Sequence, residues 1–260
     1  MAEDISKRRV ALLTGAASGI GAATARLFAE RGYRVAALDI QEKGQQICNE
    51  IYQAGGDCHF YRCDITNEAQ VQATVTTVQE HLGRIDALLN IAGIVLVKPL
   101  VETGWMEFLR VVEVNLGGTF LLCKYVLPIM RAQQSGSIVN MASVSGHVGQ
   151  TEHVLYGASK GAIISFTRAL AWEVAANGIR VNSISPGSVD TPMLRADVTG
   201  EAARTGRSFE EIKRERENEQ AFRRWADPRE IAETVFFLAG EAASFITGTD
   251  LLVDGGWVAR

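Results

Sequence analysis

The sequence has no excess of positive charge and few prolines, and both shortages limit what the protein can be. Its 26 lysine and arginine residues are outnumbered by 30 aspartate and glutamate residues, so the formal net charge is −4. A protein that follows a phosphate backbone needs a basic surface, so a nucleic-acid partner is excluded. Five prolines among 260 residues form no proline-rich linker. Because an α/β chain of this length often folds as one domain, we expect a single domain over residues 1–260.

Long hydrophobic runs are also missing. The most apolar long stretch, Phe120 to Met130, is interrupted by Lys124 and Pro128 and is shorter than the ~18 residues of a membrane span. The first residues, MAEDISKRR, contain neither the apolar segment nor the small-residue cleavage site of an export signal. We therefore expect a protein that neither crosses a membrane nor is secreted.

Cysteine is scarce and unpatterned. Four cysteines, at positions 48, 58, 63 and 123, form no CxxC pair. Cys58, His59 and Cys63 are the one group that suggests a metal, but the spacings of zinc ligands are missing and the segment has the pattern of a strand. The prediction is no metal site and four free thiols, which suit a reducing cytoplasm.

What the chain does contain is an alternation of short apolar runs with segments of helical periodicity. A hydrophobic fraction of 47% supplies a core and excludes a disordered chain. Short strands separated by longer helices indicate βαβ units, hence an α/β fold with a parallel sheet covered by helices on both faces. The expected helices include 19–31, 43–53 and 67–81. The expected strands are Val10–Leu13, Arg34–Leu38, Cys58–Cys63, Ile85–Leu89, Ser137–Asn140, Val181–Ile184 and Leu251–Val253.

One segment, between Pro192 and Asp227, departs from this alternation because it is polar and crowded with both signs of charge. Ser208 and Glu211 have the spacing of a capping box, and Asp227 followed by Pro228 indicates the start of another helix. Two interpretations remain open: a solvated helix face, or a mobile lid over a site.

A glycine-rich turn directly follows the first strand and opens the first helix, in the sequence TGAASGIG at positions 14–21. Glycines there allow positive φ and let backbone N–H groups approach a phosphate, which the helix N-terminus also favours. The turn is not a P-loop, because no Gly-Lys-Ser/Thr follows, and its spacing is also not G-x-G-x-x-G. Read alone, it is either a strand-to-helix turn or a pyrophosphate site. The candidate residues are Gly15, Ser18, Gly19, Ile20 and Gly21.

Asp39 narrows this choice. It ends the second strand, 18 residues after Gly21, where a dinucleotide fold places an acid for the adenosine ribose hydroxyls. Its carboxylate would repel a 2′-phosphate, and Ile40 supplies no arginine to bind one. The predicted cofactor is therefore NAD rather than NADP, with a strand-end turn residue as the alternative reading of Asp39.

Ser143, Tyr156 and Lys160 form the next informative group. Tyr156 and Lys160 stand at positions i and i+4, on one face of a helix. A phenol is a poor base at pH 7, and a fixed ammonium beside it favours the phenolate and lowers its pKa. Ser143 follows the strand Ser137–Asn140, so its hydroxyl emerges at the carboxyl edge of the sheet, where ligands of this fold bind.

Together these motifs resemble the short-chain dehydrogenase/reductase family over essentially the whole chain. The resemblance implies a three-layer Rossmann fold with a doubly wound, parallel, seven-stranded sheet, and reversible hydride transfer between NAD and a secondary alcohol or ketone. One departure is Ile91, where the family's Asn-Asn-Ala-Gly motif has its second asparagine. The matching positions are TGAASGIG at 14–21, Asp39, Asp64, Asn90 with Gly93, Asn115, Ser143, Tyr156 with Lys160, and Pro186 with Gly187.

The resemblance also implies roles. Tyr156 would be the acid/base, Ser143 would hydrogen-bond the same substrate oxygen, Lys160 would bind the nicotinamide ribose, and Asn115 would hold a water in the proton path. The remaining cofactor contacts that it implies are Asp64 and Ile65 at the adenine, Asn90 and Gly93 along the cleft, and Pro186, Gly187 and Thr191 at the nicotinamide. Residues 193–224 would form the substrate lid, and the segment ending in Trp257 would join subunits of a homotetramer.

The substrate is open at this point. Candidate pocket residues lie between Ser143 and Tyr156, namely Ser145, His147, Gln150 and His153. They fit a cyclic diol, a sugar or a hydroxy-acyl compound. Two other functions are alternatives: a catalytically idle protein that senses NAD or binds a partner, and an epimerase or dehydratase acting on nucleotide sugars. Both are disfavoured, because the Tyr and Lys are kept and because no room is left for a second substrate domain.

Overall fold

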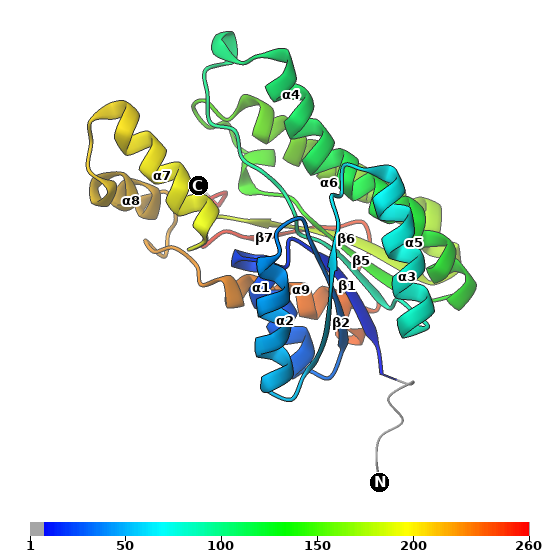
Figure 1. The fold of residues 1–260 in the computed structure, drawn as a ribbon. Helices are drawn as coiled ribbons and strands as arrows, with labels where there is room; N and C mark the ends of the chain where they lie inside the picture. Colours follow the sequence, from blue (N-terminus) through cyan, green and yellow to red (C-terminus); the bar gives the residue numbers. More distant parts are fainter. Residues whose placement is uncertain (1–7, 260) are drawn as a thin grey trace.

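The computed structural model describes residues 8–259, so residues 1–7, where no export signal is expected, lie outside the described part. The described strands form one parallel, seven-stranded sheet in the order β3-β2-β1-β4-β5-β6-β7 (Figure 1). Each lies within two residues of its predicted bounds, and the predicted fold class is confirmed. The strands are β1 Val10–Thr14, β2 Arg34–Asp39, β3 Asp57–Arg62, β4 Ala87–Asn90, β5 Gly136–Met141, β6 Ile179–Pro186 and β7 Asp250–Val253.

Helices cover both faces of this sheet. On one face α1, α2 and α9 bury residues such as Phe28 and Val235, and on the other α3, α5 and α6 bury residues such as Val126. Alternate residues of β1 enter the two cores, which explains why its apolar run is continuous. The helices are α1 Gly19–Glu30, α2 Lys43–Gln53, α3 Glu68–Leu82, α4 Trp105–Val112, α5 Gly118–Gln133, α6 Val154–Val174, α7 Pro192–Thr205, α8 Phe209–Asn218 and α9 Pro228–Ala239.

The sheet reverses its winding at β1, and this point positions the site. Ala11 of β1 pairs with Val35 of β2 on one side and with Ala87 of β4 on the other. The crossover helices therefore leave β1 and β4 toward opposite edges, which opens a crevice at the carboxyl ends of these strands.

α4, a π-helical turn at Glu113–Gly117, and α5 form a continuous helical run, Trp105–Gln133, of 29 residues. By length and composition alone this run is long and apolar enough to cross a membrane, so the expectation based on the shorter stretch Phe120–Met130 was wrong about length. Half of its most apolar part is buried inside the protein. Leu122 and Val126, for example, pack in the core on one face of the sheet. Packing in the fold therefore accounts for the apolar character of this helix.

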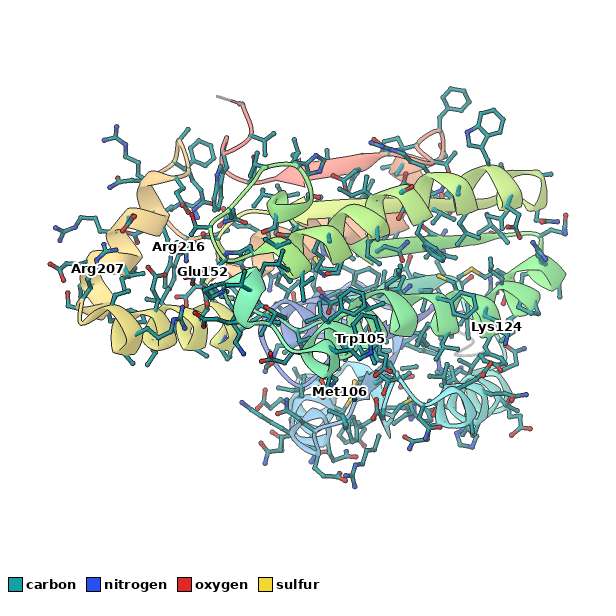
Figure 2. The ribbon with its side chains drawn as sticks, turned by 90° about the horizontal axis from the view of Figure 1, so that it is seen from above. Trp105, Met106, Lys124, Glu152, Arg207 and Arg216 are labelled. Carbon is teal, nitrogen blue, oxygen red and sulfur yellow. A yellow bond between two sulfur atoms is a disulfide. The ribbon has the colours of Figure 1, made fainter. Side chains whose placement is uncertain are left out.

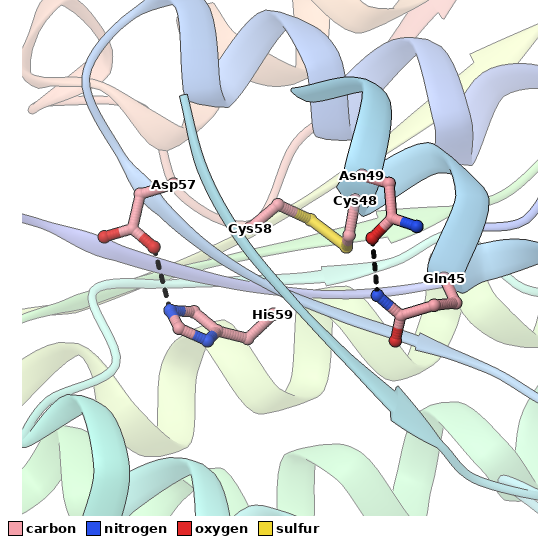
Figure 3. Close-up of a disulfide and its surroundings, with 6 residues drawn as sticks. All are labelled: Gln45, Cys48, Asn49, Asp57, Cys58 and His59. Atoms are coloured by element: carbon pink, nitrogen blue, oxygen red, sulfur yellow. Dashed lines mark hydrogen bonds and ion pairs between the residues drawn. A yellow bond between two sulfur atoms is a disulfide. The ribbon is translucent and has the colours of Figure 1, made fainter. Parts of the chain in front are cut away.

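The cysteines differ from the prediction of four free thiols. Cys48 of α2 and Cys58 of β3 form a disulfide with Cα atoms 5.0 Å apart, whereas Cys63 and Cys123 are buried free thiols (Figure 3). The spacing of ten residues carries no signal for this pair, which meets because α2 packs directly against the strand that follows it. With two of the four cysteines in a disulfide, the cysteines no longer support a reducing compartment. His59, on the opposite face of β3, pairs with Asp57 at 2.8 Å.

The charged segment folds into α7 and α8, which stand beside the sheet (Figure 1). The predicted capping box is present, since Ser208 and Glu211 cap each other's backbone, and Asp227 caps α9 with Pro228 in its first turn. α7 and α8 share a small apolar cluster of their own, formed by Val198, Ile212 and Trp225. The segment is therefore more than a solvated helix face.

Candidate active site

The turn between β1 and α1 requires glycine at three positions. Gly15 has φ +75°, and a Cβ there would lie 3.0 Å from the Cα of Ala92. Gly19 has φ +52°, and a Cβ on Gly21 would lie 1.9 Å from the carbonyl oxygen of Gly15. The backbone is thus folded so tightly that side chains are excluded, which is the property that a phosphate-binding turn needs.

This turn presents the N-terminus of α1 to the crevice. Ser18 occupies the N-cap position in an extended conformation, and its side chain leaves the first-turn N–H groups uncapped. The hydroxyl of Thr14 accepts N–H bonds from Ile91 and Ala92, both at 3.1 Å, and so ties the turn to the end of β4. Free N–H groups and the positive end of the helix dipole fit a pyrophosphate.

Two carboxylates stand at the ends of the next strands. Asp39 accepts the N–H of Ala17 and the N–H of Gln41, each at 2.9 Å, which fixes its carboxylate beside the glycine turn. Asp64 accepts bonds from the backbone N–H and the hydroxyl of Thr66, at 3.0 and 2.7 Å. These bonds hold the pKa of Asp64 below its usual range.

A cavity of about 540 Å³ runs along the carboxyl edge of the sheet and joins these groups to the second half of the chain. Its lining brings together most of the predicted cofactor and catalytic residues, and three of the four predicted substrate residues. From the predicted set it contains Gly15, Ser18, Gly19, Ile20, Gly21, Asp39, Asp64, Ile65, Gly93, Ser143, Ser145, Gln150, His153, Tyr156, Lys160, Pro186, Gly187 and Thr191. The glycine turn, the two acids and the tyrosine therefore share one space, of the kind that a dinucleotide and a small substrate require.

Tyr156 and Lys160 lie one turn apart on α6, and Ser143 follows β5. Lys160 is buried and donates from Nζ to the carbonyl of Met141 at 2.8 Å. Burial lowers the pKa of Lys160 to about 8. Burial raises the pKa of Tyr156 more than a hydrogen bond from Ser143 lowers it, and the nearby charge of Asp197 raises it further.

The pKa of Tyr156 is raised, whereas the sequence predicted that it would be lowered. The spacing in the sequence places the lysine charge beside the phenol, but it carries no information on the cost of burying a phenolate. In the structure burial is the largest influence on both groups and drives each toward its neutral form. Ser143 is the neighbour that works in favour of the phenolate.

Two predicted asparagines lie behind the cavity wall. Asn90 is buried and donates to the side-chain oxygen of Asn140 at 2.9 Å, joining β4 to β5. Asn115 sits in the π-helical turn, where its side chain accepts the Ile94 N–H at 2.8 Å and donates to the Ile94 carbonyl at 3.0 Å. Both side chains position the strand end next to Gly93 rather than line the cavity.

His147 and Trp257 also differ from the prediction. Nε2 of His147 lies 2.7 Å from Asp250 and 3.2 Å from Ser185, so the histidine anchors its loop to β6 and β7 outside the cavity lining. Trp257 is buried within the single chain and lines the cavity, so its burial needs no partner subunit.

The structure adds residues to the site that the motifs do not contain. α7 contributes Met193, Leu194 and Asp197, and α8 contributes Arg216. The family resemblance and the charge of the segment indicated a lid over residues 193–224, but neither singled out these residues.

Comparisons with known proteins agree with this architecture. Residues 15–258 match the family model described as Enoyl-(Acyl carrier protein) reductase. The chain is 42% identical over 255 residues to cis-4-hydroxycyclohexanecarboxylate dehydrogenase from Sinomonas cyclohexanicum, which covers 96% of this chain and 97% of the relative. It is 39% identical over 262 residues to D-threitol dehydrogenase from Mycolicibacterium smegmatis, and the match covers 97% of this chain and 94% of that relative. Among solved structures, a variant of actinorhodin polyketide ketoreductase with NADPH is similar at a TM-score of 0.94 and 35% identity, over 98% of this chain and 99% of the other.

The family match, the relatives and the solved structure thus cover nearly the whole chain and agree with one fold. The named relatives are dehydrogenases, which supports oxidoreductase activity on small-molecule alcohols. The chain belongs to the short-chain dehydrogenase/reductase family of oxidoreductases.

Proposed function

We propose that the protein is an NAD-dependent dehydrogenase that interconverts a secondary alcohol and a ketone, with Tyr156 as acid/base. The observation that supports this most is the shared cavity, which holds Tyr156, Ser143 and Lys160 together with the glycine turn and Asp39. Hydride exchange with the substrate carbon is the chemistry that a nicotinamide supplies when bound.

Each side chain has a role in moving the proton. In oxidation, the Tyr156 phenolate takes the hydroxyl proton of the alcohol, and in reduction the phenol returns it to the carbonyl oxygen. Ser143 donates to the same substrate oxygen and stabilises the charge that develops there. Lys160, held by the Met141 carbonyl, offers its remaining N–H groups toward a ribose hydroxyl. Asn115 acts as a positioning residue through its two hydrogen bonds to the Ile94 backbone. That it also holds a water in the proton path stays a prediction.

Asp39 supports NAD rather than NADP. Its carboxylate is fixed at the adenosine end by two backbone N–H groups, and the neighbouring Ala17 and Ile40 carry no charge. A 2′-phosphate would therefore meet a fixed negative charge. We expect a preference for NAD over NADP of at least tenfold in kcat/KM, which Asp39→Ser should reduce.

The test of the function follows NADH absorbance with simple alcohols such as cyclohexanol and cyclopentanol. The wild type should oxidise at least one of them, and Tyr156→Phe should reduce kcat by at least a hundredfold while NAD still binds. Full turnover by Tyr156→Phe would overturn the role of the tyrosine. NAD binding without turnover of any alcohol or ketone would favour the idle alternative, a protein that senses NAD or binds a partner.

We also propose a homotetramer. Large apolar side chains are exposed on the single chain, Trp105 and Met106 on α4 (Figure 2) and Trp172 on α6 among them. Leu251 and Leu252 of the edge strand β7 are partly exposed as well. Exposed apolar area of this kind marks subunit contacts. Light scattering should give four times the chain mass of 28.2 kDa, and a monomer would refute the proposal.

A further inference from the structure

A carboxylate of α7 faces the reacting groups. Asp197 lines the cavity with Tyr156, and only 10% of its side chain is exposed. It is close enough to Tyr156 for its charge to raise the pKa of the phenol. A buried acid beside the acid/base is costly and needs a physical reason.

Packing of α7 enforces this position. The helix begins at Pro192, capped by the hydroxyl of Thr191, which accepts the N–H of Leu194 at 3.2 Å. Val198 is fully buried in the cluster with Ile212 and Trp225. Asp197, directly before Val198, lines the cavity, and Leu194, one turn earlier, lines the cavity and also packs against the Val198 cluster.

Asp197 has no hydrogen-bond donor of its own in residues 8–259. Its nearest cation is Arg216, whose Nη2 atom lies 3.8 Å away. That atom already donates to Glu201 at 2.8 Å, so its stronger bond goes to the other carboxylate. Burial accordingly raises the pKa of Asp197. A carboxylate nine-tenths buried and short of donors can be satisfied by a donor from the molecule that fills the cavity.

His153 adds a second acceptor. Its ring lies 6.3 Å from the Tyr156 ring, and Nδ1 lies 2.7 Å from the carbonyl oxygen of Thr151. A carbonyl accepts, so Nδ1 carries the proton, and in the neutral ring Nε2 is left as an acceptor. Two acceptors near Tyr156 fit a substrate that brings more than one hydroxyl.

The carboxylate of Asp197 itself disfavours an anionic substrate. Arg216 lies 3.8 Å from it but donates to Glu201 at 2.8 Å, and Arg204 and Arg207 pair with the other carboxylates Glu152 and Glu201. A hydroxycarboxylate would have to place its charge beside Asp197. A neutral molecule with a second hydroxyl meets no such cost.

We propose that Asp197 is a specificity-determining residue that accepts a hydrogen bond from a second hydroxyl of the substrate, so that the enzyme prefers neutral diols and polyols to mono-alcohols and hydroxycarboxylates. The proposal rests on the proposed dehydrogenase function and narrows its substrate class. Of the compounds that the sequence left open, it favours the cyclic diol and the sugar over a hydroxy-acyl compound.

The experiment compares kcat/KM for cyclohexanol, for the 1,2-, 1,3- and 1,4-cyclohexanediols and for 4-hydroxycyclohexanecarboxylate with NAD. At least one diol should exceed cyclohexanol about tenfold or more, as a hydrogen bond to a charged group gives, and the carboxylate should fall below that diol. In Asp197→Leu the advantage of the diol should fall below about twofold, with Asp197→Asn intermediate. The charge of Asp197 also acts on Tyr156 and so changes the rates of all the alcohols together. The ratio between diol and cyclohexanol therefore reports the hydrogen bond.

Glu210→Gln is the matched control, because it removes one exposed carboxylate from α8 outside the cavity lining and should leave the ratio unchanged. Equal kcat/KM for cyclohexanol and every diol, or an unchanged ratio in Asp197→Leu and Asp197→Asn, overturns the proposal while the dehydrogenase function stands. A higher kcat/KM for the carboxylate than for the diols also overturns it. If none of these compounds is oxidised, the affinities of the diols and of cyclohexanol for Tyr156→Phe with NAD bound are compared instead. Equal affinities overturn the proposed hydrogen bond to Asp197.

Discussion

The Nζ atom of Lys160 lies 5.6 Å from the centroid of the Tyr156 ring, one helical turn along α6. Burial lowers the pKa of the lysine to about 8 and raises the pKa of the tyrosine. The lysine therefore gives up its proton first, and it is neutral in the pH range where an unassisted phenol would titrate. Near pH 7 the ammonium is still present but held in a buried place that disfavours its charge.

We expect Lys160→Met to stabilise the protein at pH 7 by about 2 kcal/mol, because the cost of burying the charge exceeds the loss of one hydrogen bond. This cost is complete below about pH 8 and disappears as the pH rises toward the ordinary lysine range. Between those limits the unfolded chain binds more protons at this position, so the free energy of unfolding of the wild type rises with pH. Urea unfolding of both proteins at pH 7 and pH 10, at equal concentration, measures the difference.

Lys124→Met is the control, since Lys124 (labelled in Figure 2) lies at the surface in an ion pair with Glu68, and its substitution should leave the free energy of unfolding nearly unchanged. A Lys160→Met variant that is less stable than the wild type at pH 7, or whose difference is the same at pH 10, would contradict the expected penalty.

The strands and the glycine turn could be predicted because their signals are local. A buried strand needs an apolar run, and the turn at Gly15 to Gly21 needs glycine whatever the rest of the chain does. Tyr156 and Lys160 could be predicted to share a face because four residues make one helical turn.

The residues that the sequence missed depend on packing between distant segments. Asp197 shares the cavity with Tyr156, and its helix is held by the packing of Val198 against Ile212. Cys48 meets Cys58 through the packing of α2 on β3, and the direction of His147 follows from a loop that bonds to Asp250. Periodicity and spacing carry no information on such contacts.

Asp197 provides a prediction on pH. Its negative charge raises the pKa of Tyr156, so Asp197→Asn should lower that pKa. Oxidation needs the deprotonated tyrosine, so the acidic limb of the kcat/KM profile should move to lower pH. The profile is measured with cyclohexanol, which has no second hydroxyl. An acidic limb that stays in place, or moves to higher pH, would show that the charge of Asp197 does not raise the pKa of Tyr156.

The disulfide between Cys48 and Cys58 gives a prediction on stability. Reduction, or Cys58→Ser, should lower the free energy of unfolding by about 2–3 kcal/mol, because the cross-link restricts the unfolded chain. For a chain of this size the melting temperature should fall by roughly 5–10 °C. Alkylation under denaturing conditions, read by mass, should label two cysteines before reduction and four after it. Labelling of all four before reduction would show that the bond does not form.

The lid gives the last prediction. Met193, Leu194 and Asp197 of α7 line the cavity, so a molecule bound there contacts this helix directly. Arg195 pairs with Asp190 at 2.6 Å close to the start of the helix, whereas toward its end the ion pair between Arg204 and Glu152 (labelled in Figure 2) is as long as 3.8 Å. We therefore expect residues 193–220 to be mobile without cofactor and ordered by it.

Limited trypsin digestion measures this, because Arg204, Arg207 and Arg214 offer cleavage sites within the segment. Saturating NAD should slow cleavage there at least tenfold, since closure lowers the population of open lid that the protease attacks. Adenosine monophosphate is the control, because it reaches the glycine turn and Asp39 without extending to α7. Cleavage at the same rate with NAD and with adenosine monophosphate would mean that α7 and α8 hold their positions through the Val198 cluster alone.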